Sequence, residues 1–164
     1  MKIASLAGLL LAITYAAASA AGADDSGIER MATCKDSWLD WKKSEPARLA
    51  ALGDHIRSGF SQHDNDAFLV PKSATSIAGL RVTQLYPDSV GMGVGLSVSV
   101  DAPFDETRRK LEVALGKPLG GCETGDGMRT CTLKISDMRT IMVMAEDNPK
   151  SATTLVGCYY YYEK

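Results

Sequence analysis

Four cysteines carry the clearest chemistry in this sequence, because a thiol can form a disulfide, bind a metal ion or act as a nucleophile: Cys34, Cys122, Cys131 and Cys158. An even number of cysteines in an exported chain is typical of disulfides. Three pairings are possible. Cys122 and Cys131 lie on either side of a Gly-rich turn in "GCETGDGMRTC", so we expect them to pair. The pair Cys34–Cys158 would then join an N-terminal helix to the last strand.

Metal binding is the alternative use of these thiols, but the sequence contains no C-x-x-C pair, and neither His55 nor His63 is near a cysteine in sequence. The polar segment 63–66 lacks the glycine and the distant glutamate of a calcium loop. The motifs G-x-S-x-G, S-x-x-K, H-E-x-x-H and the P-loop are also missing. We therefore expect no catalytic residue, no metal and no cofactor, and a protein that is not an enzyme.

The first twenty residues have the pattern of a secretory signal peptide. Lys2 supplies the positive charge, residues 3–17 form an apolar stretch, and Ala18-Ser19-Ala20 supplies small residues for cleavage. We expect cleavage after Ala20, with Ala23 as the alternative site. This pattern predicts an exported protein of the periplasm.

The remaining residues, 21–164, are enough for a single domain with a hydrophobic core. No later stretch approaches the ~18 apolar residues that a membrane-spanning helix needs, so we expect no membrane anchor. The whole chain has 18 Lys and Arg residues against 20 Asp and Glu residues, and cleavage removes Lys2 from the first group. This acidic balance argues against a nucleic-acid partner.

Hydrophobic periodicity predicts two N-terminal helices. The first begins near Ser26 and places one apolar stripe along its length, made of Met31, Cys34, Trp38 and Trp41. The second is capped by Ser44, has Pro46 in its first turn, and carries an apolar face of Leu49, Leu52, Ile56 and Phe60. A polar loop over residues 61–66 should follow.

The rest of the chain predicts a sheet with one inserted helix. Strands are expected at 80–86, 90–100, 129–136, 139–146 and 153–162, with a turn at 87–89, a helix at 104–115 and a further short strand before Cys122. The order is α-α-β-β-α-β-β-β. Short connections favour antiparallel pairing. We therefore expect an α+β domain with a mainly antiparallel, twisted sheet of about five strands and two disulfides.

Two strands suggest a surface for a partner. Residues 90–100 alternate between an apolar face and a face of glycines that ends in Ser97 and Ser99, which is either covered by a close neighbour or open. In the final "CYYYY", Tyr160 and Tyr162 should pack inward with Cys158, while two tyrosines point outward. We take as candidate partner-binding residues these outward tyrosines, the serines and the acidic residues of the Gly-rich turn: Tyr159, Tyr161, Ser97, Ser99, Glu123 and Asp126.

The mature chain resembles the small periplasmic immunity proteins that protect bacteria against antibacterial effectors of type IV and type VI secretion systems. The resemblance rests on the signal peptide, the size, paired cysteines such as Cys122 and Cys131, and the α+β order around "VDAPFDETRRKLEVALGKPLGGC". It carries no functional residues over to particular positions. It implies a monomer or homodimer that binds a cognate toxin and occludes its active site. The alternatives are an inhibitor of a lysozyme-type peptidoglycan hydrolase, an envelope assembly or stress factor, and an unrecognised hydrolase.

Overall fold

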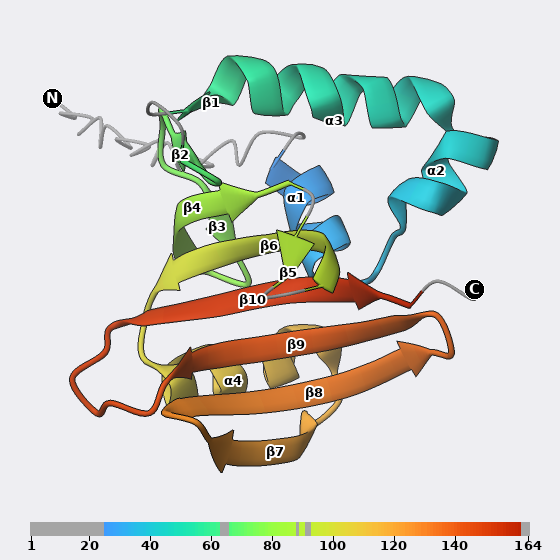
Figure 1. Cartoon of the computed structure of the whole chain (residues 1–164). Coiled ribbons are helices and arrows are strands. Elements are labelled where there is room, and N and C mark those ends of the chain that lie inside the picture. The colour runs from blue at the N-terminus through green and yellow to red at the C-terminus, as the bar shows by residue number, and fades with distance from the viewer. Residues whose placement is uncertain (1–24, 63–65, 88, 91–92, 162–164) are drawn as a thin grey trace, which may run out of the picture.

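The structure is a computed structural model of the chain and describes residues 25–62, 66–87, 89–90 and 93–161. The predicted signal peptide and Tyr162 lie outside these ranges. Within them the chain forms four helices and ten strands (Figure 1). The helices are α1 (Asp25–Ala32), α2 (Trp38–Ser44), α3 (Pro46–Gly59) and α4 (Phe104–Leu115). The strands are β1 (Phe60–Gln62), β2 (Leu69–Pro71), β3 (Ser76–Ile77), β4 (Leu80–Tyr86), β5 (Ser89–Val90), β6 (Gly93–Asp101), β7 (Gly120–Gly125), β8 (Met128–Ser136), β9 (Arg139–Glu146) and β10 (Thr153–Tyr160).

The expected α+β class with an antiparallel sheet is confirmed. The strand order is β1-β2-β4-β6-β10-β9-β8-β7, and β3 and β5 pair with β4 and β6. Every pairing between described strands is antiparallel. This order has two similar halves, because α3 is followed by β1, β2, β4 and β6, and α4 by β7, β8, β9 and β10. Each half runs from an edge of the sheet to its centre, where β6 meets β10.

The single helix expected from Ser26 to Trp41 was wrong. Helix α1 ends at Ala32, and the chain turns at Cys34, which has a left-handed φ of 54°. Ser37 then caps α2, since its hydroxyl accepts hydrogen bonds from the backbone N–H groups of Leu39 and Asp40. The break lets Cys34 reach the sheet, and the described chain therefore has three helices before its first strand instead of two.

The expected number of about five strands was also too low. Phe60 begins β1 instead of ending a helix face, and the predicted loop over 61–66 contains the rest of that strand. The strand predicted over 90–100 is a hairpin, because β5 folds back on β6 with Val90 opposite Gly93. Ser89 belongs to β5, so the turn predicted over 87–89 is shorter than expected.

The helices cover one face of the sheet. A row of five paired, fully buried residues crosses β8, β9, β10, β6 and β4 on this helix face: Cys131, Val143, Val156, Val98 and Leu85. Helix α1 contacts β6 and β10, and α4 contacts β9 and β10 on the same side of the sheet (Figure 1). The hydrophobic core therefore lies between the helices and this face.

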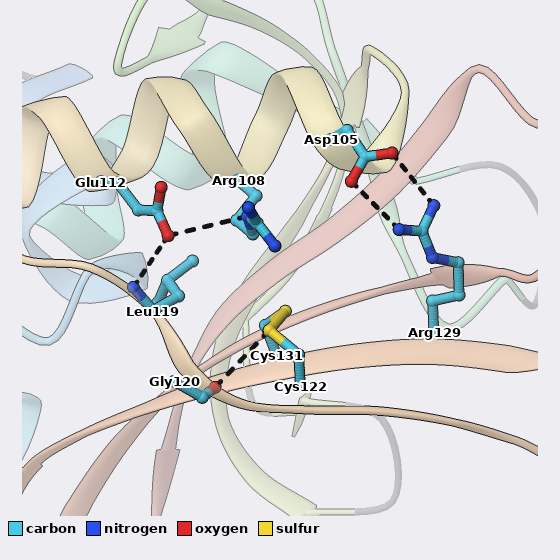
Figure 2. The surroundings of a disulfide bond; sticks show 8 residues. All are labelled: Asp105, Arg108, Glu112, Leu119, Gly120, Cys122, Arg129 and Cys131. Carbon is cyan, nitrogen blue, oxygen red and sulfur yellow. Dashed lines mark hydrogen bonds and ion pairs between the residues drawn. A yellow bond between two sulfur atoms is a disulfide. The ribbon is translucent and has the colours of Figure 1, made fainter.

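Two disulfides join the parts, with the expected pairing. Cys34–Cys158 ties the turn after α1 to β10 in the centre of the sheet, and Cys122–Cys131 ties the edge strand β7 to β8. Figure 2 shows the second bond beside α4, where the Arg129 guanidinium pairs with Asp105 at 3.0 Å. The first cross-link therefore holds the N-terminal segment on the centre of the sheet, and the second holds the edge strand on its neighbour.

Candidate functional site

The side of the sheet away from the helices is here called the open face. Paired residues of antiparallel strands project their side chains to the same face, so the register defines its rows. One row crosses from β7 to β4 through Glu123, Thr130, Met144, Leu155, Ser99 and Gln84. The next contains Thr132, Met142, Gly157, Ser97 and Tyr86. The register therefore brings four of the six candidate partner residues to this one face: Ser97, Ser99, Glu123 and Tyr159.

The open face is hollowed around its central strands. The hollow has a volume of about 690 Å³, and its lining includes both serines of β6. Ser97 and Ser99 are almost fully buried, whereas Tyr86, Met144 and Leu155 around them are only partly buried. Among the described residues, no helix lies over these serines. The face is therefore open, and it is concave where short side chains lie between longer ones.

The C-terminal tyrosines alternate as predicted up to the last described residue. Tyr160 is 3% exposed and packs edge-on against Trp38, with ring centroids 6.2 Å apart. Burial raises the pKa of the Tyr160 hydroxyl, and the nearby Arg139 opposes this effect. Tyr159, opposite Thr140 and Gly95, lies at one end of the open face, and its ring is 4.7 Å from that of the half-exposed Tyr161. These two tyrosines form an accessible aromatic pair.

Carboxylates gather at the other end of the open face. Glu123 and Asp126 belong to β7 and the turn that follows it, and the structure adds Glu146 and Asp147 from the end of β9. The Asp147 backbone N–H donates to the Gly127 carbonyl at 2.7 Å, which holds the two turns together. All four carboxylates are exposed, and within the described part of the chain none of them forms an ion pair. We call these four residues the acidic rim.

Sequence reasoning missed the methionines of the open face, which are Met128, Met142 and Met144. The strand over 139–146 was predicted correctly, but Ile141 and Val143 on one face and Met142 and Met144 on the other are all apolar. A strand that is apolar on both faces does not show which of them meets the helices. The relevant signal was the choice of residue, since flexible, polarizable methionines suit an adaptable contact surface.

A second, smaller cavity lies under α3. It has a volume of about 290 Å³ and an apolar lining that includes Met31, Trp38, Leu52 and Leu96. Trp41 packs beside it, 3% exposed, with the Arg48 guanidinium stacked 4.1 Å above its ring. Trp41 is therefore a core residue, whereas Trp38 is only partly buried and divides its ring between the cavity and Tyr160.

The described residues contain no group of three or more His, Cys, Asp or Glu side chains that could hold a metal ion. No described helix has the length and apolar character needed to cross a membrane. In comparisons with known proteins, no family model, no curated protein and no solved structure matches the chain.

Proposed function

We propose that this protein binds another exported protein on its open face and thereby neutralises it, as an immunity protein neutralises an antibacterial effector. The observation that supports the proposal is a hollowed sheet face that no described helix covers, with methionine, leucine and tyrosine side chains around two almost fully buried serines. Tyrosine and methionine are enriched in protein interfaces, and a central hollow suits the anchoring side chain of a partner.

The open face has the size that such a contact needs. In the order of the sheet, the six strands β4-β6-β10-β9-β8-β7 span roughly 24 Å at the usual strand spacing. Along the strands, the 8 residues of β10 extend roughly 26 Å. Their product is roughly 600 Å², the same order as the ~800 Å² that each partner buries in a standard interface. A protein seated over this area would have its own surface blocked by steric exclusion.

The platform is also rigid, which reduces the cost of binding. The central strands are paired on both sides, and the two disulfides attach to β10 at the centre of the sheet and to β7 and β8 at its edge. A preorganised surface loses little conformational entropy when a partner binds. This suits an inhibitor, whose affinity must exceed that of the partner for its substrate.

The test begins with the purified chain from residue 21 as bait for periplasmic and secreted proteins, including the product of the adjacent gene. A bound partner is then assayed by calorimetry and by survival of cells that express it in the periplasm. The variant Leu155→Arg places a charge in the hollow and should abolish both binding and protection. Val113→Arg is the matched control, because Val113 is 80% exposed on α4, away from the open face.

Three results would contradict the proposal. The first is a bait that captures no exported protein, and the second is a captured protein that retains its full activity in the complex. The third is a Leu155→Arg variant that binds the partner as tightly as Val113→Arg does. The last result would move the interface away from the open face.

A further inference from the structure

We infer that the hollow of the open face receives a lysine or arginine side chain that projects from a loop of the partner protein. The inference rests on the proposed function and specifies the chemistry of its partner. It combines three features of the hollow: apolar side chains that fit the stem of a basic residue, a carboxylate at one end, and a serine hydroxyl that can accept a hydrogen bond.

The apolar part of the hollow comes from Met128, Met144 and Leu155. Met144 and Leu155 lie opposite one another on β9 and β10 and are both partly buried. Lysine and arginine bury their methylene stems along such surfaces while the charged head remains in a polar environment. Methionine adapts its shape to a long, narrow side chain more readily than a branched residue does.

The carboxylate is Glu146, which lines the hollow beside Met128. It belongs to the acidic rim, whose four carboxylates are exposed and form no ion pair within the described residues. This end of the open face is therefore negative. It would attract a cationic loop during encounter and orient it toward the hollow.

The hydroxyl is that of Ser99, which is 5% exposed and lines the hollow. Its backbone carbonyl accepts a hydrogen bond from the Thr83 hydroxyl at 3.2 Å, which leaves the side-chain hydroxyl turned to the hollow on the open face. A hydroxyl oxygen can accept a hydrogen bond, so the Ser99 side chain offers an acceptor to a guanidinium or ammonium group that enters the hollow.

The hollow is much larger than one side chain, so the occupant is a loop with a basic residue at its centre. The acidic rim would repel an acidic loop. A purely apolar loop would leave the negative charge of the rim uncompensated. A second copy of this chain would present its own acidic rim to the first, so we expect no self-association through this face.

The experiment uses NMR titration of the folded protein with a short acetylated peptide that has a central Lys-Arg-Lys. The matched probe is the same peptide with acetyl-lysine and citrulline in place of the basic residues. We expect the basic peptide to shift the methyl signals of Met128 and Met144 and the amide signal of Ser99, and the neutral peptide to leave them unchanged. Glu146→Gln should weaken binding about two- to fivefold, as for one exposed ion pair. The control Glu106→Gln removes an equivalent charge from α4 and should have no effect.

The inference is wrong if the neutral peptide binds equally well, if the shifts map elsewhere, or if Glu146→Gln behaves like Glu106→Gln. Concentration-dependent shifts at the hollow without peptide would assign it to self-association instead. These results differ from failure of the proposed function. A partner that is lost with Leu155→Arg but is insensitive to Glu146→Gln would leave the function standing and remove only the basic side chain.

Discussion

The two disulfides should contribute unequally to stability, because they close loops of very different length. Cys34 and Cys158 are separated by 124 residues and Cys122 and Cys131 by 9. A covalent link restricts the unfolded chain, and the restriction grows with the logarithm of the number of residues in the closed loop. The test replaces each pair by alanine and compares the free energies of unfolding of the two double variants.

The chain-entropy relation gives about 5 kcal/mol for the long loop and about 2.7 kcal/mol for the short one at room temperature. The environment of the sulfurs adds to the difference. Cys34 and Cys158 are 2% and 0% exposed, whereas Cys122 is exposed at the edge of the sheet. Removing the buried pair also leaves unfilled volume in the core, which costs further free energy. We therefore expect the first double variant to lose at least about 2 kcal/mol more than the second.

Equilibrium unfolding in urea, followed by tryptophan fluorescence and far-UV circular dichroism, measures both losses. A loss of this size approaches the whole stability of a small domain, so the first variant is also refolded in trimethylamine oxide, which stabilises folded proteins. Its urea unfolding midpoint is then measured in the presence of this osmolyte. Equal losses, or a larger loss for the Cys122–Cys131 pair, would refute the loop-length argument. They would indicate that strain or residual structure in the reduced chain dominates.

Three further predictions concern single residues. Trp41→Ala should cost about 3–5 kcal/mol in urea unfolding, because the ring is buried in the core; an unchanged midpoint would contradict its structural role. The Arg30 guanidinium holds the pKa of Asp36 below its ordinary value, so the stability that Asp36 contributes is present above pH ~3.9 and lost as the pH falls through the lowered pKa. Asp36→Asn should therefore lower the urea midpoint at pH 7 and have little effect near pH 2; an equal effect at both would exclude this linkage. Tyr159→Ala and Tyr161→Ala should weaken a confirmed partner's binding by about 1–4 kcal/mol in calorimetry and leave the melting temperature nearly unchanged; full-strength binding would exclude the aromatic pair from the interface.

The elements that the sequence predicted well are those with local signals at both ends. Helix α4 has the expected bounds, since Pro103 precedes its first turn and Gly116 ends it with a φ of 65°. Strands β8 and β9 also match, because residues 137–138 form a tight turn between two alternating runs. In these segments the information needed for the fold lies within a few residues of each boundary.

The elements that sequence reasoning missed depend on distant contacts. The apolar stripe through Cys34 continues the helical period, but the bond to Cys158 and the cap at Ser37 break the helix there. Strands β1, β2 and β3 have only two or three residues, too few for a period to show. Strands β2 and β3 pair with the longer β4, and β1 pairs in turn with β2.

The open face and its hollow are a product of register, and the disulfide of β10 protects that register. The two halves of the sheet meet where Leu155 lies opposite Ser99, so the hollow exists only while β6 and β10 are correctly aligned. A slip of one residue would turn Leu155 toward the core and bring Cys158 to the open face. Cys158 is bonded to Cys34 on the helix side and cannot make this change. The bond that stabilises the fold most is therefore also the one that fixes the side chains of the proposed binding surface.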